Sequence, residues 1–189
     1  MKKHGKIVSL KNLSVSLIWM TLGANLACAE DFSLSSQQIQ AGKTLANAQV
    51  FNGFGCTGKN QSPQLQWRGA PAGTKSFAVT VYDPDAPTGS GWWHWTVLNI
   101  PAHVHELPAG ASPANLPAGV VEGRTDYGQA GFGGACPPVG DKPHRYQFKV
   151  WALNTEKLEL DQNSSGALVG YMVRAHAIGK AELQAYYAR

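Results

Sequence analysis

Short β-rich runs separated by Gly and Pro are the feature of this chain that most restricts its fold. Three runs, residues 76–82, 93–100 and 146–154, are rich in branched and aromatic residues, and the chain of 189 residues contains 21 Gly and 11 Pro. Such runs are typical of strands connected by turns and loops. The chain is therefore predicted to form a mainly β, mainly antiparallel domain with a peripheral helix or two.

The third run predicts which face of its strand is buried. Successive side chains of a strand point to opposite faces, and one alternating set is apolar, namely Tyr146, Phe148, Val150 and Ala152. We expect this set to face the core. Trp151 and Leu153 lie in the other set, which indicates that the second face is also partly covered.

The C-terminal part predicts one helix and a final strand. Ser164 or Ser165 is a suitable N-cap for a helix that runs to about His176, and residues 181–187 alternate as a strand does. Residues 101–119 and 128–143 are rich in Gly, Pro and Ala and lack periodicity. They are predicted to be long loops, which in a compact domain are usually functional.

The N-terminus has the three parts of a secretory signal peptide. Four Lys precede an apolar run over residues 13–26, which ends at Ala27-Cys28-Ala29. We predict that residues 1–29 are a signal peptide cleaved after Ala29, that residues 30–189 form a single domain, and that the protein is periplasmic.

Two other readings of the N-terminus are weaker. A stable membrane anchor would need a longer and less interrupted apolar run, because this one contains Ser14, Ser16 and Asn25. A lipoprotein would need Cys28 as its first mature residue, but Asn25 stands where a lipobox usually has an apolar residue.

The net charge of the mature chain argues against nucleic acid as a partner. Cleavage removes four of the 16 basic residues and no acidic residue, which leaves 12 Lys plus Arg against 12 Asp plus Glu. A nucleic-acid-binding domain would need a basic patch or stripe. The overall positive charge therefore reflects the export signal.

Cysteine usage predicts a disulfide. Of three Cys, cleavage removes Cys28 and leaves the pair Cys56 and Cys136, and exported proteins favour disulfides. Closing a loop of about eighty residues would stabilise the protein by roughly 4 kcal/mol in the chain-entropy model. A nucleophilic or metal-binding thiol is the alternative, but an oxidising compartment would tend to consume it.

Acidic and imidazole side chains are the candidates for a functional site. The segment Asp83-Pro84-Asp85-Ala86-Pro87 ends an apolar run, His94 lies in the next run, and His144-Arg145-Tyr146 opens the third. Taken singly, the two Asp residues fit an ordinary turn and His94 fits a buried histidine bonded to a backbone carbonyl. Their combination favours one shared site.

Other candidate features carry structural interpretations. His103 and His105 lack a third ligand at metal-site spacing, so we expect no metal and no cofactor. The Trp residues around His94 are expected to pack in the core, although a platform for an apolar ligand stays open. Gly131, Gly133 and Gly134 could offer backbone N–H groups to an anion or could simply make the loop flexible.

Several motifs together resemble the phosphatidylethanolamine-binding protein family, also called Raf kinase inhibitor-like. They are Asp83-Pro84-Asp85-Ala86-Pro87, Trp92-Trp93-His94-Trp95, and Pro137-Pro138 followed by His144-Arg145-Tyr146. Residues 60–65 and 164–170 extend the likeness over the mature chain, which resembles the bacterial YbhB/YbcL type on its exported, YbcL-like side. The resemblance implies two antiparallel sheets in a Greek-key arrangement with an anion-binding pocket at one end.

The resemblance also implies the residues of that pocket. It places Asp83, His94, His144 and Tyr146 around the anion, with Pro87 and the loop of Gly134 and Pro137 as the rim. Asp85, Trp92 and Arg145 are supporting residues. A bare carboxylate would repel an anion, so we expect Asp83 to accept a hydrogen bond from an imidazole and fix its orientation. We expect Arg145 to form a structural ion pair, since strand neighbours point to opposite faces.

Three functions remain from the sequence. The favoured one is an exported protein that binds a small phosphate- or carboxylate-bearing ligand or a phospholipid headgroup, with an unidentified protein partner that it modulates. A second is a protein that interacts with or inhibits partners through its surface. A hydrolase with an Asp/His pair is the weakest, because no Gly-x-Ser-x-Gly nucleophile motif accompanies that pair.

Overall fold

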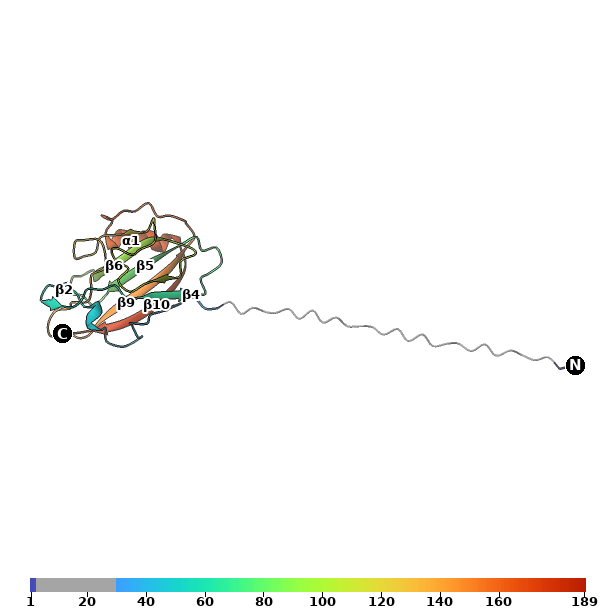
Figure 1. Ribbon diagram of the computed structural model, residues 1–189, viewed down its shortest axis with the longest axis horizontal. Helices are drawn as coiled ribbons and strands as arrows, with labels where there is room; N and C mark the ends of the chain where they lie inside the picture. The colour runs from blue at the N-terminus through green and yellow to red at the C-terminus, as the bar shows by residue number, and fades with distance from the viewer. Residues whose placement is uncertain (3–29) are drawn as a thin grey trace.

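Two antiparallel sheets and a small hairpin dominate the computed structural model, which describes residues 1–2 and 30–189 (Figure 1). The larger sheet has the order β10-β9-β5-β6-β8, with bounds Ala177–Tyr187, His144–Leu153, Ser76–Asp83, Trp92–Pro101 and Val121–Glu122. The smaller sheet, β1-β4-β7, consists of Ser33–Ser35, Leu65–Arg68 and Glu106–Leu107. The hairpin pairs β2 (Asn52–Gly53) with β3 (Cys56–Thr57). The mainly β, antiparallel prediction is confirmed.

The predicted elements lie close to their expected positions. The three β-rich runs form β5, β6 and β9, and the helix α1 spans Gly166–His176 after the N-cap Ser165, whose side chain accepts a hydrogen bond from the Leu168 amide at 3.3 Å. A short 3-10 turn, η1, spans Asn47–Gln49. Of the two predicted loops, the first contains the short strand β7 and the second has no strand longer than an isolated bridge.

Strand β10 begins earlier than the sequence predicts. It starts at Ala177, directly after α1, instead of residue 181, because it pairs with β9 from Ala177 opposite Leu153 to Tyr187 opposite His144. Glu182 and Gln184 favour helix locally, but this pairing with β9 outweighs their propensity.

The core has two parts, one on each face of the larger sheet. Between the sheets, Phe77, Val79 and Val81 of β5 are buried, whereas Ala78 on the opposite face packs with Val169 and Val173 of α1. The predicted inward face of β9 is confirmed, since its four alternating apolar residues are at most 1% exposed. Trp151 packs on the helix side, which confirms that both faces are covered.

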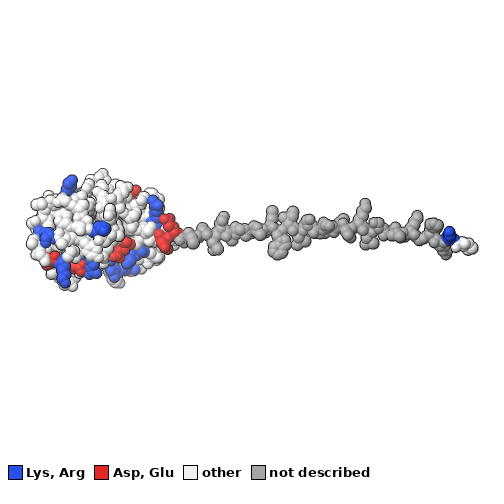
Figure 2. All heavy atoms as spheres, turned by 90° about the horizontal axis from the view of Figure 1, so that it is seen from below, with Lys and Arg blue, Asp and Glu red and all other residues white. Residues whose placement is uncertain are grey.

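The chain ends and surface add three observations. The predicted signal peptide falls largely on residues 3–29, which lie outside the described residues. Within the described part, no helix has the length and apolar character needed to cross a membrane. On the face in Figure 2, basic and acidic side chains lie next to one another along one edge of the domain.

Candidate functional site

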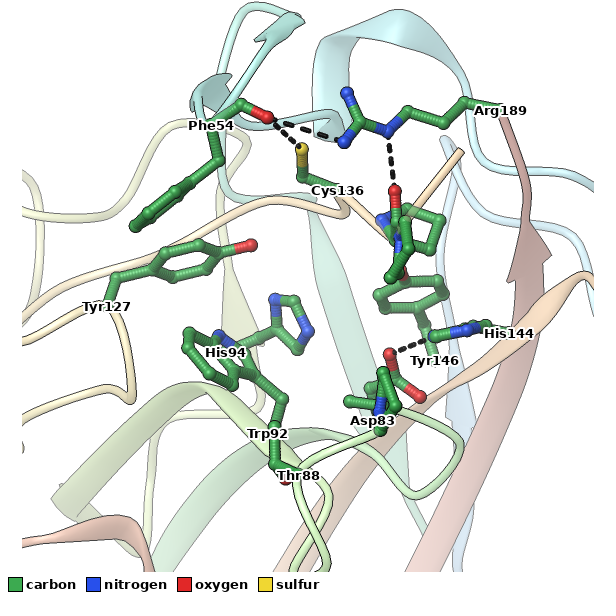
Figure 3. Close-up of a pocket in the computed structure, with 14 residues that line it drawn as sticks. Phe54, Asp83, Thr88, Trp92, His94, Tyr127, Cys136, His144, Tyr146 and Arg189 are labelled. Carbon is green, nitrogen blue, oxygen red and sulfur yellow. Dashed lines mark hydrogen bonds and ion pairs between the residues drawn. The ribbon is translucent and has the colours of Figure 1, made fainter. Parts of the chain in front are cut away.

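A cavity of about 380 Å³ lies where β5 ends and where β6 and β9 begin. It brings together seven of the ten residues that the sequence assigned to the site, namely Asp83, Pro87, Trp92, His94, Pro137, His144 and Tyr146 (Figure 3). Antiparallel pairing explains this convergence, because the end of β5 lies beside the beginnings of its two neighbours.

The carboxylate of Asp83 is buried and fully engaged. It is 2% exposed, and one oxygen accepts a hydrogen bond from His144 Nδ1 at 2.7 Å while the other accepts one from the Asp85 amide at 2.8 Å. The hydrogen bond from imidazole to Asp83 that the sequence predicted is therefore present. It orients the His144 ring and offsets the buried negative charge.

A second carboxylate faces the other side of the His144 ring. Asp141 Oδ2 lies 3.3 Å from His144 Nε2, and the Asp141 side chain is 40% exposed. The imidazole therefore lies between one buried and one solvent-accessible carboxylate. Because Asp141 engages Nε2, the ring is not free in this arrangement to take a proton from a substrate as a general base would.

His94 is a buried histidine bonded to a backbone carbonyl, which is one of the two interpretations that the sequence left open. Its Nδ1 lies 2.8 Å from the Gly133 carbonyl oxygen, and its backbone carbonyl in turn accepts a hydrogen bond from the Gly133 amide. Burial lowers the pKa of the His94 ring, although the Gly133 carbonyl and the charge of Asp83 act in the opposite direction. One ring nitrogen thus bonds to the backbone, and the other, Nε2, has no hydrogen-bond partner among the described residues.

Three buried polar atoms around this cavity have no hydrogen-bond partner among the described residues. They are His94 Nε2, Tyr146 Oη and Trp92 Nε1. Burial, reinforced by the charge of Asp83, raises the pKa of Tyr146, so its hydroxyl is a donor at neutral pH. Buried polar groups are nearly always paired in proteins, so these three atoms are available for hydrogen bonds to a molecule in the cavity.

Asp85 and Arg145 support the site from outside the cavity. Arg145 Nη2 lies 2.6 Å from Asp85 Oδ1, and the Arg145 amide donates to Asp85 Oδ2 at 2.8 Å. Both residues line a neighbouring cleft of about 430 Å³ that shares His144 with the cavity. The structural ion pair predicted for Arg145 is present, and it ties the turn after β5 to the start of β9.

Gly134 is not where the sequence placed it. It does not line the cavity, because its amide donates to Asn60 Oδ1 at 2.7 Å and its carbonyl accepts a hydrogen bond from the Tyr127 hydroxyl at 2.9 Å. A Cβ atom at this position would lie 2.4 Å from the Gln49 carbonyl oxygen. The glycine therefore serves close backbone packing instead of presenting its N–H to an anion.

An aromatic wall and a C-terminal cation line the cavity without having been predicted. Tyr127 stacks on Phe51 at 3.9 Å between centroids and contacts Phe54, which is 71% exposed. Arg189 donates to the carbonyl oxygens of Pro137 and Phe54. No periodicity or motif distinguishes these residues in the sequence, since loops of irregular conformation carry them to the site.

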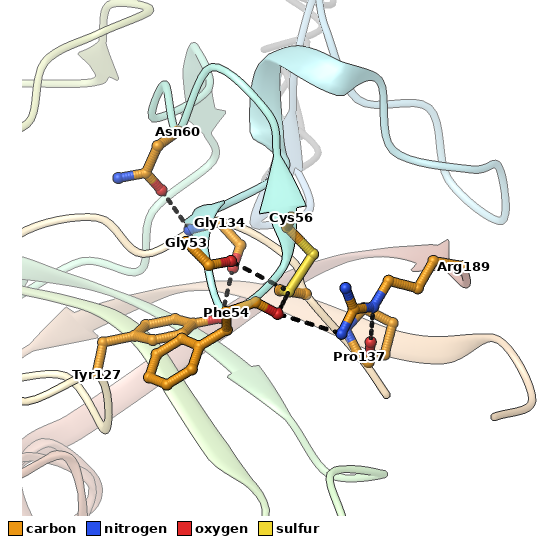
Figure 4. Close-up of a disulfide and its surroundings, with 9 residues drawn as sticks. Gly53, Phe54, Cys56, Asn60, Tyr127, Gly134, Pro137 and Arg189 are labelled. Atoms are coloured by element: carbon orange, nitrogen blue, oxygen red, sulfur yellow. Dashed lines mark hydrogen bonds between the residues drawn. A yellow bond between two sulfur atoms is a disulfide. The ribbon is translucent and has the colours of Figure 1, made fainter. Parts of the chain in front are cut away.

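The predicted disulfide between Cys56 and Cys136 is present and lies at the rim of the cavity (Figure 4). It connects β3 to the segment that precedes Pro137 and Pro138. The same hairpin carries Phe54, so the bridge holds two sides of the rim together. The bridge also uses both thiols that could have acted as nucleophiles or metal ligands.

The cavity also has a hydroxyl group in its lining, which is hydrogen-bonded within the protein. Thr88 lines it, but its hydroxyl donates to the Gly91 carbonyl oxygen at 2.5 Å, whereas an activated nucleophile would bond to a base. Across the described residues, no cluster of three or more His, Cys, Asp or Glu is suited to a metal ion. What converges on the cavity is a set of donors, one free imidazole nitrogen and a cation at the rim.

Comparison with known proteins identifies the family. The family model for phosphatidylethanolamine-binding protein matches residues 35–188. The chain is 60% identical to the UPF0098 protein YbcL of Escherichia coli over 94% of this chain and 98% of that protein, and 48% identical to YbhB of the same organism over 82% and 99%. The crystal structure of E. coli YbcL matches 85% of this chain and 99% of its own with a TM-score of 0.83. The chain therefore belongs to the phosphatidylethanolamine-binding protein family.

Proposed function

We propose that this protein is an exported binding protein that holds a small phosphate- or carboxylate-bearing ligand, or such a headgroup, in the cavity of Asp83, His94 and His144. The observation that carries the proposal is the set of three buried polar atoms without partners, on His94, Tyr146 and Trp92. Tyr146 and Trp92 can donate hydrogen bonds to anionic oxygens, and a buried donor gains a full hydrogen bond when such a ligand binds.

The polar groups around the cavity also favour a small anion. The Asp83 carboxylate is already hydrogen-bonded to His144 at 2.7 Å, and the guanidinium of Arg189 lies at the rim. Tyr127, Phe54 and Pro137 provide apolar walls, as in most small-molecule sites. The family takes its name from a phospholipid whose headgroup carries a phosphate, which agrees with this chemistry.

Native mass spectrometry of the mature protein, purified from the periplasm, tests the proposal. Wild type is expected to retain a small anionic species. Its protein mass should match a chain that begins at Glu30. His94→Ala removes a contact to the ligand, and His144→Ala leaves Asp83 uncompensated, so each variant should lose the species. Added inorganic phosphate should bind the variants roughly 10- to 100-fold more weakly, as expected for a hydrogen bond to a charged group.

His103→Ala is the matched control, because His103 is exposed on a loop outside the cavity. It should retain the species and bind phosphate as wild type does. Near-ultraviolet circular dichroism checks that the cavity variants are folded. Equal phosphate affinity in wild type, folded His94→Ala and folded His144→Ala would contradict the proposed pocket.

A further inference from the structure

The hydrogen position on His94 follows from its backbone partner. Nδ1 faces the Gly133 carbonyl oxygen at 2.8 Å, and a carbonyl can only accept, so Nδ1 carries the hydrogen of the neutral ring. Nε2 is then an acceptor with a lone pair. His94 is 3% exposed, and Nε2 has no partner among the described residues.

The surroundings of His94 favour this neutral ring. Burial is the largest influence and lowers the pKa of His94, while the Gly133 and Gly134 backbone and the charges of Asp83 and Asp126 act against it. The groups that surround the ring come from β5, β6, β9, a loop and the C-terminus, and the titratable or charged ones are Asp83, Asp126, Tyr127, His144, Tyr146 and Arg189.

A fully deprotonated ligand does not match this arrangement. Figure 3 shows His94 between the rings of Tyr127 and Tyr146, and Asp83 lines the same cavity. An anionic oxygen placed against Nε2 would bring two acceptors together near a carboxylate. One proton between the ligand oxygen and Nε2 turns this repulsion into a hydrogen bond, while Tyr146 and Trp92 donate to the remaining oxygens.

We propose that the cavity binds its ligand together with one proton, shared between His94 Nε2 and a ligand oxygen, and therefore prefers phosphate monoesters to phosphodiesters. This inference rests on the proposed function and specifies the chemical class of ligand. A monoester monoanion brings the proton itself. A monoester dianion or a diester must take one proton from solvent when it binds. For either ligand, the complex then contains one proton more than the free ligand and the protein with a neutral His94 ring.

The proton count predicts how affinity changes with pH. When binding takes up one proton, the affinity falls tenfold for each unit by which the pH rises. Methyl phosphate, with a second pKa of about 6, should bind with nearly constant affinity below that pH and tenfold more weakly per unit above it. Dimethyl phosphate has no such proton and relies on His94 alone, so at pH 7 it should bind more weakly than methyl phosphate.

Isothermal titration calorimetry of the mature wild-type protein with these two probes tests the inference. Neither probe has an amine, so only the phosphate and the protein can accept the proton that is taken up from the buffer. At pH 7.5, titrations of methyl phosphate in buffers of different ionisation enthalpy should reveal uptake of about one proton per ligand bound. His94→Gln provides an N–H donor that does not titrate, so it should bind the methyl phosphate dianion with uptake near zero.

His103→Gln is the matched control and should keep the proton uptake of wild type. Methyl phosphate affinity that is constant from pH 6.5 to 8 would overturn the proton-coupled inference and leave the proposed function intact. Equal or tighter binding of dimethyl phosphate at pH 7 would overturn the stated ligand preference. If neither probe binds between pH 5 and 8, both the inference and phosphate binding itself are overturned. The wild-type proton count decides the matter even if His94→Gln fails to fold.

Discussion

Asp85 is a residue whose charge supports the site without entering the cavity. Its two oxygens accept hydrogen bonds from the side chain and the backbone amide of Arg145. The hydrogen bond from the Arg145 side chain is the main reason that the pKa of the Asp85 carboxyl is lowered. A lowered pKa in the folded state means that the ionised carboxylate contributes stability.

The contribution of Asp85 should therefore depend on pH. It is present above the ordinary pKa of an unfolded Asp, about 3.9, and is lost as the pH falls through the lower folded-state value. We expect Asp85→Asn to be less stable than wild type in urea at pH 7, with a difference that shrinks as the pH is lowered toward about 2. Glu156→Gln, at an exposed turn, is the control. A pH-independent difference for Asp85→Asn would rule out this explanation.

At the scale of elements, the contact between α1 and β6 depends on two glycines. Gly166 and Gly170 pack against the Trp93 ring, and a Cβ atom added to them would lie 2.2 Å and 2.8 Å from its nearest atoms. In an exposed helix, replacing Gly by Ala usually stabilises by about 0.5–1 kcal/mol. Here the cost of the steric overlap is larger than that gain, so replacing Gly by Ala should destabilise the protein.

Gly166→Ala is expected to lower the free energy of unfolding by about 1–3 kcal/mol, as overpacking does. Gly170→Ala should have a smaller effect, because its new Cβ meets the far edge of the indole instead of its attachment point. Urea denaturation of both variants measures which one loses more unfolding free energy. The control is Leu168→Ala, at a helix position that is 45% exposed. A stabilising Gly166→Ala would mean that helix propensity outweighs the packing of Trp93.

On the scale of the whole molecule, the disulfide joins segments that are 80 residues apart. It ties the β2–β3 hairpin to the segment before β9, next to the C-terminal Arg189, and both segments contribute to the cavity rim. A crosslink over such a distance acts mainly by restricting the unfolded chain.

A Cys56→Ser, Cys136→Ser double variant should therefore lose roughly 2–4 kcal/mol of unfolding free energy in urea. Reduced wild type is the matched comparison and should unfold at a similar midpoint. Intact mass with alkylation, before and after reduction, gives the thiol count in periplasmic protein. Two free thiols without reduction, or a double variant as stable as oxidised wild type, would show that the bridge does not have this role.

Local sequence patterns were enough to predict several elements and the chemistry of several residues. The runs that form β5, β6 and β9, the buried face of β9 and the N-cap of α1 depend on alternation and capping, which are local properties. The hydrogen bond between Asp83 and an imidazole was predicted from the family resemblance together with the chemistry of a carboxylate. The ion pair of Arg145 followed from local geometry, because strand neighbours point to opposite faces.

The rest of the cavity lining could not be predicted from local patterns, because it depends on contacts between segments distant in the sequence. Tyr127 lies on an irregular loop, and Arg189 lies 52 residues from its hydrogen-bond partner Pro137. Tertiary packing also places Gly134 in a close backbone contact instead of at the rim, and it extends β10 back to Ala177. The physical reason is that propensity and periodicity act over a few residues, whereas these contacts depend on how loops distant in sequence pack against a finished sheet.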